Sequence, residues 1–251
     1  MTGLTPLVWC VVAFGLLLGT QRWFQTQLQR FLVALTRDAR LTVILYALLF
    51  APGAALHEVS HWLAAKVLGV RTVTFSLVPK EGPGDQLRLG YVETERTDPI
   101  RSALIGVAPL LSGVALLSLL TLSQLALEPV VGATVESEIG SVIRTVALLP
   151  AVPDVGLWLY LVVAVSNTML PSAADRSAWL PAGLIVLSGV VVIVWSGLGL
   201  RGMGWLGAQT QGVLPKLSAV FGLTASLNLL LGLTLWGGGQ IVLWARRLIS
   251  D

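Results

Sequence analysis

The sequence predicts an all-α polytopic membrane protein with about six transmembrane helices and one small β-hairpin. Hydrophobic residues make up 55% of the 251 residues and charged residues only 12%, about half the usual share in a soluble protein. The mean hydropathy is +0.83. Backbone groups inside a bilayer must be hydrogen-bonded within helices or a closed barrel, and the long continuous apolar runs of this chain favour helices.

A membrane-spanning helix needs roughly 20 predominantly apolar residues. We predict six such helices; the fourth is short because Pro171 ends it, and the glycines at 237–239 predict a bend or an early end in the sixth. The first apolar run lacks the basic start and the cleavage site of a signal peptide, so we expect it to be retained in the protein as the first membrane span. The six predicted helices cover residues 4–20, 41–68, 100–127, 155–170, 178–200 and 217–245.

Between the first two spans, the segment "RWFQTQLQRFLVALTR" is amphipathic. Phe24, Leu28, Phe31 and Leu35 share one helical face, and arginines flank the segment. This pattern predicts a helix that lies in the membrane interface.

The segment 71–94 changes from a helical to an alternating period. Apolar residues recur at every second position in "RTVTFSLV" and again in "QLRLGYVET", on both sides of a connection rich in Gly and Pro. This arrangement predicts a β-hairpin. Its strand edge could capture an extended peptide, or the hairpin could simply plug the helix bundle. The linker 128–154 is predicted to be a loop with room for one short helix.

Charge and cysteine content exclude several classes of protein. The net charge of +3 comes from scattered basic residues, which does not indicate nucleic-acid binding, and the single Cys10 excludes an intrachain disulfide and a cysteine-rich metal site. Nine basic residues fall on the side of the membrane that is predicted to hold both termini, and seven fall on the opposite side. We therefore expect a multi-pass protein of the cell membrane with cytoplasmic termini.

The second predicted span contains both histidines of the chain, in "APGAALHEVSHWLAAKVLG". His57 and His61 are four residues apart, so both imidazoles face one side of a helix and can reach one ion. Zinc lowers the pKa of a bound water to about 7, and Glu58 is placed to accept its proton. Ionisable residues inside a span indicate function. The alternative is that the histidines bond to neighbouring helices and Glu58 is a buried or interfacial acid.

A catalytic zinc needs a third protein ligand, and with no further histidine this ligand must be Asp or Glu. Most acidic residues lie in polar loops, which leaves Asp154 and Asp175 near the two ends of the fourth span. The second and fourth spans are predicted to run in the same direction, so the end of the fourth reaches the level of the histidines. Asp154 would then be about 30 Å away along the helix. Asp175 is therefore the predicted ligand.

Four stretches of this sequence resemble the site-2 protease family of intramembrane zinc metalloproteases: "ALHEVSHWLAAKVLGV", "LGYVE", "GVAPL" and "SNTMLPSAAD". The resemblance covers about residues 41–177 and implies a three-helix catalytic core there. The whole chain, 1–251, would form one membrane-embedded domain. The hairpin at 71–94 would be an insertion, and the accessory spans would be 1–20, 178–200 and 217–245.

The resemblance also implies the roles of the site residues. His57, His61 and Asp175 would bind Zn²⁺, and Glu58 would be the catalytic base. Asn167, eight residues before the aspartate, would bind the substrate backbone, although a polar contact between helices is the alternative. The implied function is hydrolysis of a peptide bond within or near a transmembrane segment of a membrane-protein substrate.

Two positions depart from the family pattern. Pro171 follows Asn167 by four residues instead of three, and Arg176 stands where glycine usually follows the aspartate. Two alternatives therefore stay open. One is a catalytically inactive relative that binds and regulates the helices of other membrane proteins. The other is a membrane zinc peptidase with a downstream glutamate ligand, for which the candidates are Glu128, Glu136 and Glu138.

Overall fold

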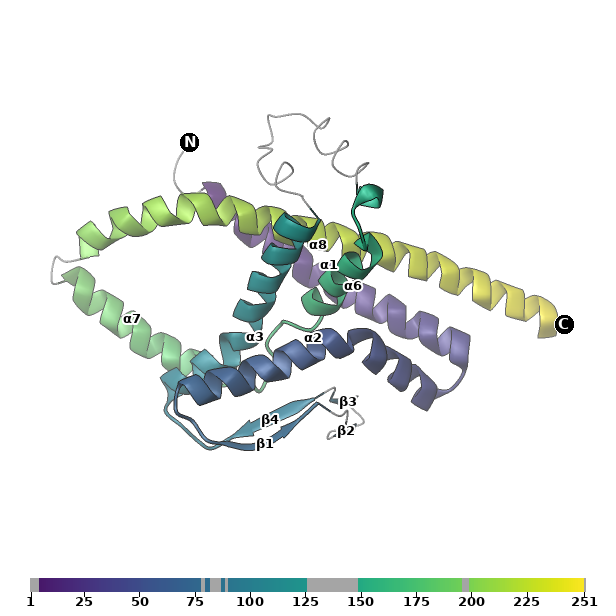
Figure 1. Ribbon diagram of the computed structural model, residues 1–251, viewed down its shortest axis with the longest axis horizontal. Coiled ribbons are helices and arrows are strands. Elements are labelled where there is room, and N and C mark those ends of the chain that lie inside the picture. Colours follow the sequence, from purple (N-terminus) through teal and green to yellow (C-terminus); the bar gives the residue numbers. More distant parts are fainter. Residues whose placement is uncertain are drawn as a thin grey trace.

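A computed structural model describes residues 5–77, 80–81, 87–88, 90–125, 149–195 and 199–250. The described chain is mostly helical (Figure 1). A π-helical turn, Leu120–Gln124, directly continues α3, and a short 3₁₀ turn, Leu149–Ala151, precedes α6. The α-helices are α1 (Thr5–Thr36), α2 (Ala39–Val67), α3 (Pro99–Leu119), α6 (Val155–Ser166), α7 (Trp179–Trp195) and α8 (Gly199–Ser250).

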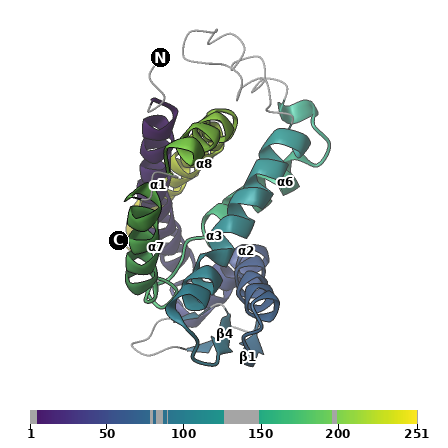
Figure 2. The same cartoon turned by 90° about the vertical axis from the view of Figure 1, so that its left-hand side faces the viewer.

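The helices form two groups. α1 and α8 lie side by side, while α2, α3 and α6 pack together beside them (Figures 1 and 2). The first group and the second meet in a core that includes Leu17 of α1, Leu117 of α3, Val162 of α6 and Val220 of α8. The β-hairpin lies beneath α2 in the view of Figure 1.

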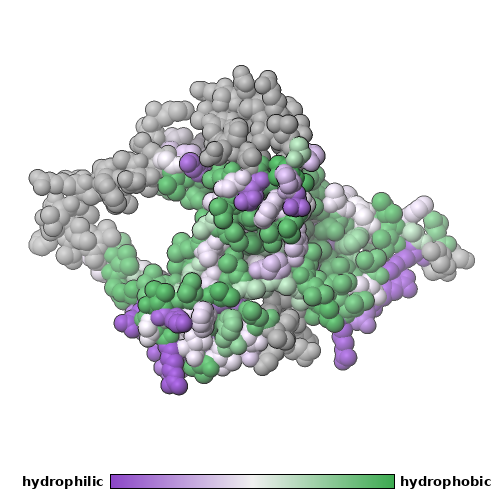
Figure 3. All heavy atoms as spheres, in the orientation of Figure 1, coloured by the Kyte–Doolittle hydropathy of each residue, from purple (hydrophilic) through white to green (hydrophobic). Residues whose placement is uncertain are grey.

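Four helices are long and apolar enough to cross a membrane, by length and composition. Protein covers little of their surface, because only 22% to 33% of the residues in their apolar windows are buried. Figure 3 shows apolar residues over most of the coloured helical surface. Four long helices with an apolar exterior of this extent are those of a helical membrane protein, whereas the predicted total of six spans is not shown. These helices are Thr5–Thr36, Ala39–Val67, Pro99–Gln124 and Gly212–Arg246.

The fourth predicted span is shorter than expected. α6 has 12 residues, about 18 Å of helix, and ends at Ser166 instead of continuing to Pro171. The chain leaves the helix there because Thr168 turns toward α2, where its carbonyl meets His57. The fifth predicted span corresponds to α7, whose described apolar part is Trp179–Ser188. The predicted linker at 128–154 falls mainly on residues outside the described ranges.

The amphipathic segment after the first predicted span is not a separate interfacial helix. It is the second half of α1, which runs without a break from Thr5 to Thr36. Phe24 and Leu28 of its apolar face are buried in a cluster with Phe50 of α2 and Val163 of α6. The prediction of a separate interfacial helix was wrong, because neighbouring helices cover the first half of this face; Leu35, at its end, is exposed.

α1 and α8 run in the same direction. Their contacts advance together along both helices, from Phe14 with Phe221, through Trp23 with Gly232, to Phe31 with Gly238. The start of α1 and the end of α8 therefore lie at opposite ends of this pair. The described helices do not establish how many segments cross the membrane between them, so the cytoplasmic location of both termini stays a prediction.

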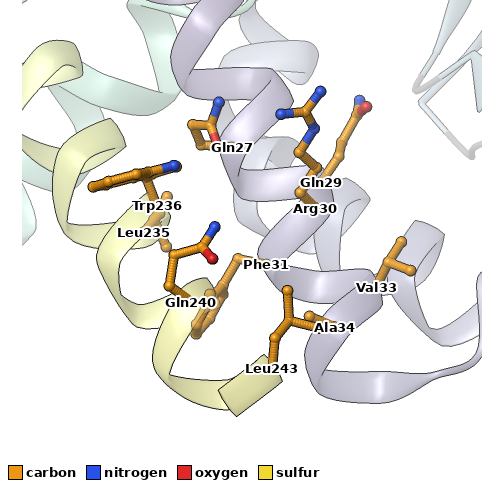
Figure 4. Close-up of a pocket in the computed structure, with 11 residues that line it drawn as sticks. Gln27, Gln29, Arg30, Phe31, Val33, Ala34, Leu235, Trp236, Gln240 and Leu243 are labelled. Atoms are coloured by element: carbon orange, nitrogen blue, oxygen red, sulfur yellow. The ribbon is translucent and has the colours of Figure 1, made fainter. Parts of the chain in front are cut away.

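A groove of about 550 Å³ separates the second half of α1 from the last part of α8 (Figure 4). Gln27 and Arg30 line it from α1, and Trp236 and Gln240 line it from α8. α8 continues as a helix through the glycines at 237–239, so the predicted bend or early end is absent. The two helices are thus incompletely packed along this stretch.

Residues next to α2 determine where this helix begins and ends. The Asp38 carboxylate accepts hydrogen bonds from the N–H groups of Arg40 (2.7 Å) and Leu41 (3.0 Å) at its start. At its end, Gly69 has a φ of +69°, a conformation that favours glycine. The N–H groups of Gly69 and Val70 bond back to carbonyls of the last turn, which closes the helix.

The predicted β-hairpin is confirmed. β1 (Thr72–Ser76) pairs in antiparallel fashion with β4 (Tyr91–Thr94), and β2 (Lys80–Glu81) pairs with β3 (Leu87–Arg88). Burial alternates along β1, but the apolar Val73 and Phe75 are the exposed residues, and the polar residues between them are half-buried. The Phe75 ring lies 6.2 Å from the ring of Trp62, which fixes the hairpin against α2.

Candidate metal centre

The three predicted metal ligands lie together in the structure. His57 and His61 are one turn apart on α2, and Asp175 lies in the segment between α6 and α7. The two Nε2 atoms are 3.1 Å apart. Asp175 places Oδ1 3.1 Å from Nε2 of His61 and Oδ2 3.8 Å from Nε2 of His57. This group could hold a metal ion.

Backbone carbonyls fix which nitrogen of each imidazole faces the group. Nδ1 of His57 lies 2.7 Å from the carbonyl oxygen of Thr168, and Nδ1 of His61 lies 2.9 Å from that of Ile105. A carbonyl oxygen only accepts, so each Nδ1 carries a proton and the Nε2 of a neutral ring is bare. Two nitrogen lone pairs and a carboxylate therefore face one another, an arrangement that a cation between them stabilises.

The spacing of the two imidazoles is close to that of tetrahedral coordination. Ligand atoms bound at about 2.0–2.1 Å in a tetrahedron are separated by about 3.3–3.4 Å, and the two Nε2 atoms are 3.1 Å apart. The carboxylate presents a different oxygen to each histidine, and with one ligand atom from each residue the three atoms lie within 4.8 Å of one another. Without a metal ion, one Nε2 would have to carry a proton, and its single N–H would be shared between the other imidazole and the carboxylate.

A tight turn orients the Asp175 carboxylate. Its Oδ2 accepts a hydrogen bond from the N–H of Ser172 (2.7 Å), and the Ser172 hydroxyl accepts one from the N–H of Asp175 (3.3 Å). The exposed Arg176 donates from Nε to the Ser172 carbonyl, so it closes the turn without entering the metal group. Burial raises the pKa of the Asp175 carboxyl, but its interactions with the two histidines and the hydrogen bond from Ser172 outweigh burial and hold that pKa well below its usual range.

A glycine of α3 allows the aspartate segment to approach. Gly106 lies against the backbone carbonyl of Asp175, and a Cβ on Gly106 would overlap that group. The preceding residue, Ile105, supplies the carbonyl that orients His61. The stretch "GVAPL" thus serves the site through its small first residue and through the backbone next to it.

α2 and α6 approach each other equally closely. Gly53 of α2 lies against the carbonyl of Ala164 and the hydroxyl of Thr168. The next contact along both helices joins His57 to Thr168, so the helices are parallel and the end of α6 reaches the histidines, as predicted. Asp154, at the start of α6, is exposed and is not part of the metal group.

Glu58 lies beside the metal group and against the hairpin. A Cβ added to Gly90 of the hairpin would stand 2.6 Å from Cγ and 3.3 Å from Cδ of Glu58. Glu58 and Gly90, together with His57 and Thr168, line a cavity of about 190 Å³ that has room for several water molecules. A carboxylate next to a metal ligand and next to water-sized space has the position of a general base.

Asn167 is buried and bonded to the accessory helices. It is 4% exposed, and its Nδ2 donates to Oδ1 of Asn228 on α8 at 2.9 Å. Its backbone carbonyl accepts hydrogen bonds from the side-chain amides of Gln21 (3.0 Å) and Gln25 (2.9 Å) on α1. These contacts agree with the alternative of a polar contact between helices, and substrate binding by Asn167 stays a prediction.

Sequence reasoning missed the groups that support the ligands. The carbonyls of Ile105 and Thr168 carry no sequence signal, because any residue has one. Gln21 and Gln25 did carry a signal: two amides one turn apart on an otherwise apolar helical face. The alternative glutamate ligands, Glu128, Glu136 and Glu138, lie outside the described residues.

Comparisons with protein-family models, curated proteins and solved structures find no match to this chain. The fold and the site therefore define the class: a helical membrane protein with a candidate metal centre of two histidines and one aspartate. Any more specific function must be argued from the chemistry of that centre.

Proposed function

We propose that this chain is a zinc-dependent endopeptidase of the cell membrane that hydrolyses a peptide bond within or near a transmembrane segment of another protein. The convergence of His57, His61 and Asp175 beside membrane helices carries this proposal. Two nitrogen ligands and one oxygen ligand leave a position open on a tetrahedral zinc, which is typical of catalytic sites. A bound zinc would supply Lewis acidity that activates water and polarises the substrate carbonyl.

The residues around the ligands supply the proton chemistry. Glu58 takes a proton from the attacking water and passes it to the leaving amine, because it lies beside His57 in the cavity that admits water. The histidines do not compete for this role, since their Nδ1 atoms are engaged by carbonyls and their Nε2 atoms face the metal position. Asp175 stays ionised at neutral pH and neutralises charge on the ion.

The hairpin gives the site a way to hold a substrate. A helical segment hides its carbonyls in its own hydrogen bonds, so it must become extended before hydrolysis. Among the described strands, β1 and β4 pair only with each other, which leaves outer edges to which an extended segment can add. Gly90, just before β4, brings this sheet into contact with Glu58. The alternative, a hairpin that only plugs the bundle, predicts no effect of edge substitutions on cleavage.

Metal analysis of wild type and Asp175→Ala, side by side, tests the metal centre. We expect about one zinc per wild-type chain and clearly less in the variant, because a ligand is lost. Asp154→Ala is the matched control and should retain the metal. A folded wild type without zinc would favour a helix-binding protein that lacks catalysis. Loss of zinc in Glu136→Ala or Glu138→Ala, and not in Asp175→Ala, would favour the other ligand set.

Glu58→Gln tests the reaction separately from the metal. The variant keeps all three ligands, so its zinc content should equal that of wild type. Cleavage of reconstituted single-span substrates should fall by about 10²–10⁴-fold, because the general base is removed. Unchanged cleavage by the zinc-loaded variant would rule out the proposed mechanism.

A further inference from the structure

Buried amides of α1 and α8 converge on one peptide at the end of α6. Gln21 and Gln25 both donate to the Asn167 carbonyl oxygen, at 3.0 and 2.9 Å, and Asn228 accepts from the Asn167 side chain at 2.9 Å. Asn167 caps the C-terminus of α6, where carbonyls lack a partner in a following turn. The two glutamines thus replace the helical donors that α6 no longer provides.

This peptide is connected directly to the candidate metal centre. The next carbonyl along the chain, that of Thr168, accepts the Nδ1 proton of His57. Fixing the Asn167 carbonyl fixes the plane of the peptide between Asn167 and Thr168, which is adjacent to the peptide whose carbonyl bonds to His57. Hydrogen bonds to Asn167 and the hydrogen bond of Thr168 to His57 therefore link the amides of α1 and α8 to a predicted metal ligand.

The amide cluster is costly to bury. Gln21 is 5% exposed and Asn228 is fully buried. Among the described residues, Oε1 of Gln21, Oδ1 of Asn167 and Nδ2 of Asn228 are buried without a hydrogen-bond partner. The cluster therefore holds buried amide atoms without partners at the same place where its other amide groups bond to Asn167.

We infer that Gln21, Gln25 and Asn228 are positioning residues of the metal centre. The α1–α8 pair holds the Asn167 peptide, and through Thr168 it holds the His57 ring in the orientation that binds the ion. The inference rests on the proposed metal centre but not on peptide hydrolysis. The inference gives α1 and α8 a role in metal binding. A change in the packing of these two helices would move the amide cluster and so alter the orientation of the His57 ring.

The double variant Gln21→Leu/Gln25→Leu tests the inference in the full-length protein. It removes both donors and keeps the side-chain size. We expect about tenfold weaker Co²⁺ and Zn²⁺ binding in chelator competition, the lower end of the effect of removing groups that orient metal ligands. The visible absorption of the Co²⁺ form should also change, because the His57 ring is no longer held. Each single variant keeps one donor and should show a smaller change.

Gln27→Leu is the matched control. Gln27 is 6% exposed on the same helix, but it lines the groove between α1 and α8 (Figure 4), and the hydrogen bonds to the Asn167 carbonyl come from Gln21 and Gln25 instead. Its variant should bind Co²⁺ with wild-type affinity and spectrum. Thermal unfolding of the metal-free proteins measures any general destabilisation, which by itself does not alter the Co²⁺ spectrum of the folded protein. Asn228→Ala provides a second test from α8 and should weaken binding if the inference is correct.

The possible results distinguish a failure of this inference from a failure of the proposed metal centre. If wild type and the double variant bind Co²⁺ with the same affinity and spectrum, the positioning role is overturned and the centre stands. If wild type binds neither ion, the centre is overturned and the positioning role with it. If the double variant does not fold, the single variant Gln25→Leu decides: unchanged binding overturns the role, and weaker binding supports it.

Discussion

The metal-site side of the molecule and the α1–α8 pair are built from similar apolar helices, yet they pack differently. Around the metal group, Gly53 and Gly106 bring backbone atoms of neighbouring segments into direct contact. Between the second half of α1 and the last part of α8, a groove of about 550 Å³ remains open, although Trp23 of α1 lies tightly against Gly232 of α8 just before it. Gly239, at that groove, has nothing within 4 Å of the place where a Cβ would stand.

This difference shows what each region requires of its residues. Metal ligands must be held within about 0.5 Å of the geometry that binds the ion, so the backbone that carries them tolerates little displacement. The stretch of α1 and α8 beside the groove carries none of the three candidate ligands, so close approach of the two backbones is not required there. A glycine is therefore necessary at Gly106, whereas at Gly239 it is only compatible with the fold.

Gly106→Ala should have the largest effect. The added methyl group overlaps the backbone carbonyl of Asp175, which must then move away from the two histidines. We expect at least about tenfold weaker zinc binding, together with a loss of about 1–3 kcal/mol of stability from overpacking. Zinc competition assays and thermal unfolding in detergent measure the two effects.

Gly239→Ala is the control for that variant. It places the same methyl group in open space on α8, where alanine is the better helix former by up to about 1 kcal/mol. Zinc affinity should be unchanged and the unfolding temperature equal or higher. Equal loss of zinc affinity in the two variants would remove the distinction between the two regions.

Gly90→Ala should have an intermediate effect confined to catalysis. The new Cβ would stand 2.6 Å from Cγ of Glu58, so that flexible side chain must shift. The three metal ligands are not in this contact. We expect unchanged zinc content and about tenfold slower cleavage, since general-base catalysis depends on hydrogen-bond distance. A parallel fall in zinc content would mean that the hairpin supports the ligands as well as the base.

The sequence predicted those parts of the structure that depend on local pattern. Continuous apolar runs located the four long helices, alternation located the hairpin, and the spacing of His57 and His61 placed both imidazoles on one helical face. Asp175 required one argument about tertiary structure, namely the direction of the fourth span. That argument was sufficient because α2 and α6 are indeed parallel.

The errors concern features that local pattern does not determine. The apolar face that includes Phe24 and Leu28 looks the same whether lipid or protein covers it, and here α2 and α6 cover it. The end of α6 at Ser166 depends on the contact of Thr168 with His57, and the residues up to Pro171 contain no helix-breaking signal. The parallel packing of α1 with α8 is a tertiary contact, which the hydropathy of either helix does not determine.

The smallest expected effect concerns the start of α3, the helix that carries Gly106 to the metal site. The Asp98 carboxylate accepts hydrogen bonds from the N–H groups of Arg101 (3.0 Å) and Ile100 (3.1 Å). The bond from the Arg101 backbone, with the nearby Arg101 charge, lowers the pKa of Asp98 below its ordinary value. The ionised carboxylate therefore stabilises the folded state above the unfolded pKa of about 3.9. This contribution is lost as the pH falls through the lower folded value.

Asp98→Asn separates the charge from the cap, because asparagine caps helices about as well as aspartate. Thermal unfolding of the metal-free proteins should show wild type losing stability relative to Asp98→Asn from about pH 5 downward. The difference should be small, since Asp98 is exposed, and groups at the metal site titrate equally in both proteins and cancel. Identical pH dependence would mean that α3 is held by its contacts with α2 and the Asp175 segment, and that the Asp98 charge adds nothing to the rigidity of the metal-site side.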